Sequence, residues 1–214
     1  MTETRPKIRL FVDAALDAGA DVVLRAQAHY LTGVMRLGPG DRVALFNGRS
    51  GEWAARIVTA GKREVHLAVE TQSAPQANPP DLWLLFAPIK KARTDFIVEK
   101  AAELGAARIC PVLTQFTQAE RVKTDRLQAH AVEAAEQCGG TFVPEVAAPQ
   151  PLSAALAALG ARHLMFCDER RTARPAAEAL AGAARGPWAV LIGPEGGFSE
   201  AEAAALLARE NTLP

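Results

Sequence analysis

The residues with the clearest chemical potential lie in a short glycine-rich segment near the end of the chain. Residues 192–197 read Ile-Gly-Pro-Glu-Gly-Gly and directly follow an apolar run at 188–192. Glycines in such a place allow a ligand to approach the backbone closely. The spacing fits neither a P-loop nor a GxGxxG fingerprint, which disfavours a nucleotide-dependent enzyme. The pattern predicts a ligand-binding loop, with a purely structural strand-to-helix turn as the alternative.

Basic side chains form a second group of candidates, because three clusters of them each follow a predicted strand. The clusters are Lys90, Lys91 and Arg93; Arg121, Lys123 and Arg126; and Arg170, Arg171 and Arg174. Lys and Arg at such places can hold the phosphates of a polyanion. Each cluster alone favours a solvated surface over a binding site, and the three together favour a polyanion partner. The chain has 24 basic and 24 acidic residues, so only the placement of the clusters favours a polyanion.

Cysteine and histidine show no pattern typical of catalysis or metal binding. The thiols Cys110, Cys138 and Cys167 include no CxxC pair, which indicates reduced cysteines in a cytoplasmic protein. The four histidines have no metal-ligand spacing, so we expect no metal. The chain has no signal-peptide pattern and no apolar run near the roughly 18 residues of a membrane span, so we expect no membrane partner.

The elements that position these residues change in character along the 214-residue chain. Short strands are expected at 8–12, 22–24, 42–46, 52–60 and 64–69, with a helical segment at 29–37, which together predict a small β-barrel. Residues 71–80 carry no charge and three prolines. We therefore place a linker at 73–80, between a domain at 1–72 and a domain at 81–214.

In the second domain strands and helices alternate. Strands are expected at 82–87, 108–113, 163–167 and 188–192, and helices at 95–104, 124–138, 153–159, 175–184 and from 199 onward. Thr94, Thr124 and Ser199 are the expected N-caps, and Ser199 has capping-box spacing to Glu202. This alternation predicts an α/β fold with a mainly parallel sheet, in which ligands bind outside the carboxyl ends of the strands.

Eight short motifs occur in an order that carries a family resemblance. They are RLF at 9–11, HYL at 29–31, VMR at 34–36, GPGD at 38–41, FIVEKAAELG at 96–105, EQCG at 136–139, VPE at 143–145 and IGPEGGFS at 192–199. Together they resemble the bacterial 16S ribosomal RNA uridine N3-methyltransferases, the RsmE family of the SPOUT class. The similarity covers essentially the whole chain.

The resemblance implies a fold and an activity that periodicity does not predict. It implies an N-terminal PUA-like RNA-binding β-barrel and a C-terminal SPOUT α/β domain with a deep trefoil knot. It further implies S-adenosylmethionine as the methyl donor, 16S ribosomal RNA of the small subunit as the substrate, and a homodimer. The alternative from another class is a non-catalytic RNA-binding or ribosome-assembly protein that retains the fold.

The resemblance also suggests roles for individual residues. The donor pocket would be formed by Cys167, Asp168, Leu191, Ile192, Gly193, Pro194, Glu195, Gly196 and Gly197. RNA phosphates would be held by Arg9, Arg36, Lys90, Arg93 and Arg121. The sequence does not identify the general base. Glu195 is the nearest carboxylate, and its alternative role is to structure the loop.

The chain departs from the family pattern in two places. Gly140 stands where many members carry an arginine, so a basic contact is expected to be missing or supplied elsewhere. Members also continue beyond the capped helix into a strand and a Leu-Gly-x-Arg-Ile-Leu-Arg type segment, which closes the knot and completes the donor pocket. The given chain stops at 211–214 without it. We therefore expect a C-terminally incomplete methyltransferase domain here, which is also the best support for the non-catalytic alternative.

Overall fold

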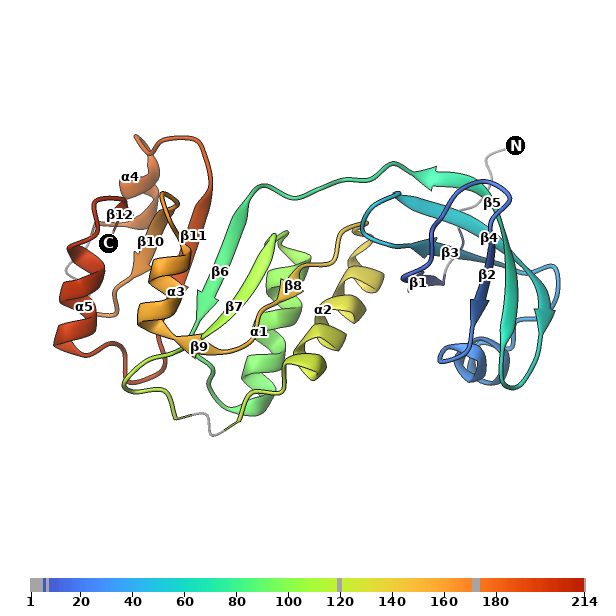
Figure 1. The fold of residues 1–214 in the computed structure, drawn as a ribbon, viewed down its shortest axis with the longest axis horizontal. Coiled ribbons are helices and arrows are strands. Elements are labelled where there is room, and N and C mark those ends of the chain that lie inside the picture. The colour runs from blue at the N-terminus through green and yellow to red at the C-terminus, as the bar shows by residue number, and fades with distance from the viewer. Residues whose placement is uncertain (1–5, 7, 119–120, 171–173, 214) are drawn as a thin grey trace. The chain divides into compact units, whose positions relative to one another are not determined.

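The computed structural model describes residues 6, 8–118, 121–170 and 174–213, and these form two compact units (Figure 1). The first unit comprises Met1–Asn78 and Ala135–Val143, and the second comprises Pro79–Ala134 and Pro144–Pro214. Helix α2 (Thr124–Cys138) therefore begins in the second unit, and its last turn belongs to the first. In the described part of the chain, no helix has both the length and the apolar character needed to span a membrane.

A five-stranded mixed sheet forms the first unit. Its strands are β1 (Arg9–Phe11), β2 (Asp21–Leu24), β3 (Arg42–Phe46), β4 (Glu52–Ala60) and β5 (Val65–Ala74), in the spatial order β1-β3-β4-β5-β2. β1 runs parallel to β3, and the other pairs are antiparallel. Buried Val65, Leu67 and Val69 alternate with more exposed neighbours, so one face of β5 joins the core. β5 runs five residues beyond its expected end because the pairing with β4 continues to Ala74.

The helical segment of the first unit is shorter than expected. It is the π-helix η1 (Tyr30–Val34), whose Leu31 side chain is fully buried. A Cβ on Gly33 would lie 2.7 Å from the His29 ring, so glycine allows this tight turn. The segment ends at Arg36, whose φ of 56° is left-handed and incompatible with a continuing helix.

A buried cation links β1 to β4 and to the last turn of α2. The Arg9 Nε donates to Glu52 Oε2 at 2.5 Å, and the two side chains are 9% and 0% exposed. The Arg9 Nη atoms donate at 2.7 Å to three carbonyls at the helix end, those of Ala135, Glu136 and Gly140. A cation at a helix C-terminus is favourable, and these bonds explain why residues 135–143 group with the β-sheet.

A parallel sheet forms the second unit and confirms the expected α/β architecture. Its strands are β6 (Leu82–Phe86), β7 (Arg108–Leu113), β8 (Glu145–Val146), β9 (Gln150–Pro151), β10 (His163–Cys167), β11 (Trp188–Ile192) and β12 (Thr212–Leu213). The order is β12-β10-β11-β6-β7-β8, with β9 also paired to β7, and every pair is parallel. The two-residue strands β8, β9 and β12 are too short for a period-two pattern, so the sequence did not predict them.

The helices of the second unit confirm one of the three expected caps, and Thr124 is the first residue of α2 rather than its cap. They are α1 (Lys91–Glu103), α2, α3 (Leu152–Ala158), α4 (Ala176–Leu180) and α5 (Glu200–Leu207). Ser199 and Glu202 form the expected capping box of α5. Thr94 is not the N-cap of α1, which begins three residues before it. Its hydroxyl instead donates to the Ile89 carbonyl at 3.0 Å and accepts from the Ile89 amide at 3.1 Å.

We expect Glu52→Gln to lower the free energy of unfolding of the first unit by about 3–5 kcal/mol, because it leaves the Arg9 charge buried beside a neutral partner. The loss is measured by hydrogen exchange of the slowest amides in β3, β4 and β5. Arg56→Ala is the control, since the Arg56–Glu70 pair is 45% and 25% exposed. It should cost less than about 1 kcal/mol. Equal losses in both variants would contradict a structural role for the buried pair.

Candidate functional site

Strand register brings the predicted site segments to one edge of the second unit. Cys167 on β10 lies opposite Ile192 on β11, and Ile192 lies opposite Phe86 on β6. The loops that follow these three strands therefore emerge next to one another. β6 has the later strand β11 on one side and β7 on the other, so the chain order reverses here. Such switch points are where open α/β sheets bind ligands.

The glycine-rich loop is packed so closely that two of its glycines have no room for a side chain. Gly197 has a φ of 66°, and a Cβ there would overlap the Glu169 carboxylate. A Cβ on Gly193 would lie 2.6 Å from the ring of Phe198. The Glu169 carboxylate also accepts a hydrogen bond from the Phe198 amide at 3.3 Å. The segment that follows β10 and the glycine-rich loop are thus in direct contact.

The side chains assigned to the donor pocket divide into buried and accessible groups. Leu191 is fully buried in the core, so its side chain does not face a ligand, contrary to expectation. Ile192 is 44% exposed at the end of β11. Asp168, whose side chain is 2% exposed, accepts from the Arg170 guanidinium at 2.6 Å. This hydrogen bond with Asp168 raises the pKa of Arg170.

The buried thiols are unsuited to nucleophilic chemistry. Burial raises the pKa of Cys167, which is half-buried at the end of β10. Burial likewise raises the pKa of Cys110 to about 11. Both thiols are therefore protonated at neutral pH and can contribute packing rather than a thiolate. In the described ranges no three His, Cys, Asp or Glu side chains are grouped to hold a metal ion.

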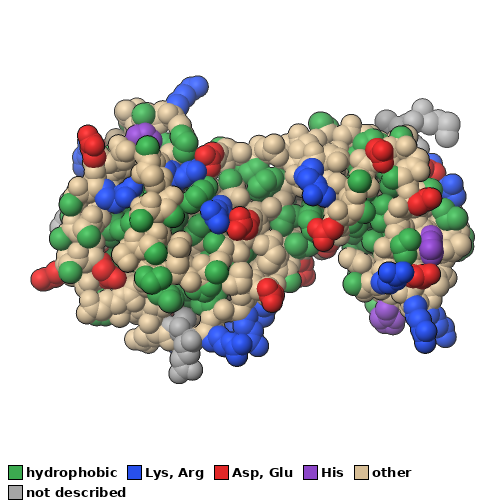
Figure 2. Space-filling view, viewed as in Figure 1, with side chains coloured by type: hydrophobic (Ala, Val, Ile, Leu, Met, Phe, Trp, Pro, Cys, Tyr) green, Lys and Arg blue, Asp and Glu red, His purple; other side chains and the backbone are tan. Residues whose placement is uncertain are grey.

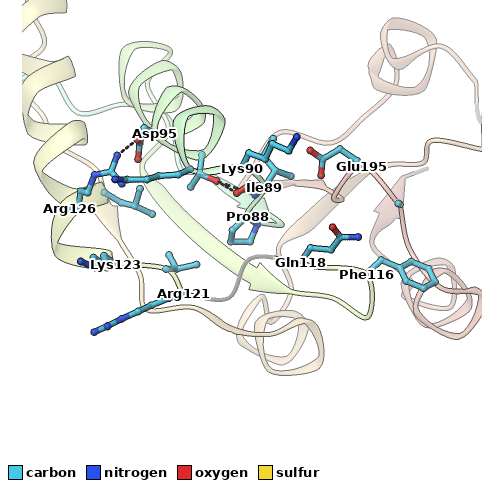
Figure 3. Close-up of a pocket in the computed structure, with 15 residues that line it drawn as sticks. Pro88, Ile89, Lys90, Asp95, Phe116, Gln118, Arg121, Lys123, Arg126 and Glu195 are labelled. Carbon is cyan, nitrogen blue, oxygen red and sulfur yellow. Dashed lines mark hydrogen bonds and ion pairs between the residues drawn. The ribbon is translucent and has the colours of Figure 1, made fainter.

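A cavity of about 740 Å³ opens at the same edge of the sheet, beside the glycine-rich loop (Figure 3). The residues that line it are Pro88, Ile89, Lys90, Lys91, Thr94, Asp95, Phe116, Gln118, Arg121, Val122, Lys123, Arg126, Leu127, Glu195 and Gly196. Five of them are basic and two are acidic, so the lining favours an anionic ligand. Figure 2 shows Lys and Arg side chains gathered below the start of α1.

One ion pair fixes a guanidinium at this cavity. Asp95 on α1 is nine-tenths buried, and its Oδ2 accepts from Nη2 of Arg126 on α2. Figure 3 shows this pair on one side of the cavity and Glu195 with Phe116 on the other. The Asp95 Oδ1 has no hydrogen-bond partner among the described residues and lies 3.7 Å from Nε2 of His130. Arg126 is thereby held in place while its side chain stays 35% exposed.

The structure brings together only some of the predicted RNA contacts. Lys90 and Arg121 line the cavity, whereas Arg93 is exposed on α1 outside the lining. Arg36 is exposed in the first unit. Arg9 is buried in its structural ion pair, so we leave it out of the phosphate contacts.

The remaining cavity residues were weakly indicated, or not indicated, as candidate site residues by the sequence. Lys123 and Arg126 belong to a basic cluster that the sequence singled out, but Phe116, Gln118 and Asp95 were not selected. Nothing in the local sequence marks Phe116, because its exposure appears only in the structure. Of the third basic cluster, Arg170 pairs with Asp168, and Arg171 lies outside the described residues.

Protein-family comparisons match both parts of the chain. A model of the RNA methyltransferase domain matches residues 76–213, and one of the RNA methyltransferase PUA domain matches residues 25–70. The chain belongs to the RNA methyltransferase family. The expected combination of a PUA-like domain with a SPOUT-type α/β domain is thereby confirmed.

Individual relatives agree with this assignment. A protein of Rickettsia conorii named ribosomal RNA small subunit methyltransferase E is 25% identical over 206 residues, covering 95% of this chain and 84% of the relative. The Synechocystis protein of the same name is 30% identical over 189 residues, covering 86% of this chain and 62% of the relative. The structure of a Legionella pneumophila methyltransferase in complex with the bound cofactor SAM has a TM-score of 0.86 at 25% identity, covering 99% and 88% of the two chains.

We expect Gly197→Ala to lower the free energy of unfolding of the second unit by about 1 kcal/mol or more, because alanine disfavours positive φ and its Cβ would displace Glu169. The measurement is hydrogen exchange of the β10 and β11 amides. Gly182→Ala is the matched control, since nothing lies within 4 Å of its Cβ position. A loss no larger than that of the control would show that the loop does not need glycine at 197.

Proposed function

We propose that this protein transfers the methyl group of S-adenosylmethionine to the ring N3 of a uridine in 16S ribosomal RNA of the small subunit. The observation that carries the proposal is that the glycine-rich loop belongs both to the predicted donor pocket and to the basic cavity. The loop contacts the segment after β10, and its Glu195 and Gly196 line the cavity. Family membership, the names of the relatives and the cofactor of the Legionella structure support it.

The donor would bind along the backbone of residues 192–197. Glycines that tolerate no Cβ give the loop its tight path, and exposed Ile192 offers an apolar surface for an adenine ring. Cys167, at the end of the neighbouring strand, would form the opposite wall, whereas the Asp168 side chain is held by its pair with Arg170. These residues fit a ligand that combines an apolar ring with polar groups. When bound, S-adenosylmethionine supplies an electrophilic methyl group on a sulfonium sulfur.

The protein's own groups would orient the uridine and handle its proton. The N3–H must lose its proton before the nitrogen can attack a methyl group in line. Glu195 makes no hydrogen bond or ion pair with any described residue, and it lies exposed at the cavity, so its carboxylate is free to accept that proton. The cations Lys90 and Arg121 would stabilise the uridine anion and hold neighbouring phosphates.

The remaining features follow from the same proposal. We propose RNA binding by the domain at 1–72 and methyl transfer by the domain at 81–214. The predicted linker at 73–80 is shortened at its start, because β5 runs to Ala74. The compact units add residues 135–143 to the RNA-binding part. A trefoil knot and a homodimer fit the family. A cytoplasmic location fits an enzyme that acts on ribosomal RNA and takes part in ribosome biogenesis, with no requirement for a metal or a membrane.

The test of the activity uses labelled S-adenosylmethionine and small-subunit RNA from cells that lack this enzyme. We expect label in 3-methyluridine, identified by mass spectrometry of the nucleosides. RNA already methylated in wild-type cells serves as the control and should accept no label. Label on a ribose oxygen would redirect the activity. RNA binding without any transfer would favour the non-catalytic assembly protein.

We expect Glu195→Gln to lower the rate of transfer by about 100-fold or more, because general bases contribute roughly that factor. The RNA dissociation constant should stay unchanged, since glutamine removes the proton acceptor but preserves the side chain's shape. Single-turnover kinetics measure the rate, and fluorescence anisotropy measures binding. Glu200→Gln, which changes an exposed carboxylate at the start of α5, is the control. An unchanged rate for Glu195→Gln would exclude this role.

A further inference from the structure

The cavity has the size, charge and lining of a site for a single nucleotide. Its volume of about 740 Å³ lies within the roughly 300–1,000 Å³ typical of small-molecule sites. Of its two carboxylates, that of Asp95 is already paired with Arg126. The side chains of Lys90, Lys91, Arg121 and Lys123 make no hydrogen bond or ion pair with the described residues. Their ammonium and guanidinium groups are therefore available to phosphates.

An aromatic side chain stands at this cavity on the side of the glycine-rich loop. Phe116 is 41% exposed, although a phenylalanine in a soluble domain is usually buried. Its Cβ lies only 3.3 Å from the position that a Cβ on Gly196 would take, so Phe116 packs against the glycine-rich loop. An accessible aromatic ring in a cavity lined by cations is suited to stacking with a base of single-stranded RNA.

The opposite side of the cavity is preorganised by two buried polar groups. The Asp95 carboxylate holds the Arg126 guanidinium, and the Thr94 hydroxyl holds the Ile89 peptide group next to Lys90. Arg126 thus presents a guanidinium whose orientation is set before a ligand arrives. An oriented guanidinium suits a phosphate, which it can bind through two parallel hydrogen bonds.

We propose that this cavity binds one nucleotide of the RNA substrate, with its base stacked on Phe116 and its phosphates held by Arg126, Arg121 and Lys90. Asp95 acts as a positioning residue through Arg126. The inference rests on the proposed function, because it takes the polyanion to be RNA. It adds a place for the target nucleotide beside the glycine-rich loop, whose Gly196 lies next to Phe116 and whose Gly197 lies next to Glu169.

The first experiment measures binding of a fluorescein-labelled, ten-nucleotide single-stranded RNA with one uridine, by fluorescence anisotropy. We expect Phe116→Ala to weaken binding about 5- to 100-fold, the range reported by alanine substitution at stacking platforms. Phe116→Trp should retain binding because it keeps the platform. Phe96→Ala is the matched control, since Phe96 is 58% exposed but lies outside the cavity. It should stay within twofold of the parent protein.

The second experiment separates a phosphate contact from a positioning role through the salt dependence of binding. Arg126→Ala should weaken binding and lower the slope of log K against log salt by about 0.7, the value for one phosphate contact on a single strand. Asp95→Asn should weaken binding but leave the slope unchanged, because Arg126 keeps its charge. Arg185→Ala, an exposed arginine outside the cavity, is the control. Melting curves confirm that each variant folds.

The third experiment locates the base directly in the unmodified protein. RNA whose one uridine is 4-thiouridine should cross-link to the peptide that contains Phe116 on irradiation. Cross-links confined to other peptides, or binding of Phe116→Ala and Arg126→Ala within twofold of the parent, would overturn the inference. If those variants also methylate uridine normally, the proposed function stands without this site. If they lose RNA binding while the parent transfers no methyl group, the site stands and the proposed function fails.

Discussion

Cys167, Ile192 and Phe86 lie level with one another on three adjacent parallel strands, and this register is the constraint on which the site depends. Parallel strands must all end at one edge, so the loops that follow them converge there although they are far apart in the chain. Shifting β11 by one residue would exchange buried Leu191 with exposed Ile192 and turn the glycine-rich loop away from Glu169. The packing of the core therefore fixes the relative positions of the loops that form the site.

Much of this arrangement was predictable because its signals are local. Short apolar runs located β10 and β11, the latter ended by Gly193, and the Ser199–Glu202 spacing located the start of α5. The start of α1 was wrong for a physical reason, since a threonine hydroxyl satisfies a nearby peptide group as readily as a helix end. The predicted family and its two-domain fold rested on ordered motifs, which carry information that periodicity lacks.

The site was less predictable because its residues meet only through tertiary structure. Asp95 and Arg126 are 31 positions apart, and nothing in either local sequence indicates that they pair. Phe116 lies at the cavity because it packs against Gly196, which belongs to a different loop. The reverse error occurred for Arg9 and Leu191. Their residue types suggested contact with a ligand. In the structure both side chains are buried, Arg9 in an ion pair with Glu52 and Leu191 in the hydrophobic core.

The Arg9–Glu52 pair has an evolutionary consequence. A chain that lost only one of these charges would keep the other buried without its partner, which is worse than losing both together. The two positions, 43 apart in sequence, therefore cannot drift independently. Arg9 also donates a hydrogen bond to the Gly140 carbonyl after α2. A change at Arg9 would therefore also remove a bond that holds the backbone there. We expect relatives to carry both charges or an apolar pair, and seldom an intermediate.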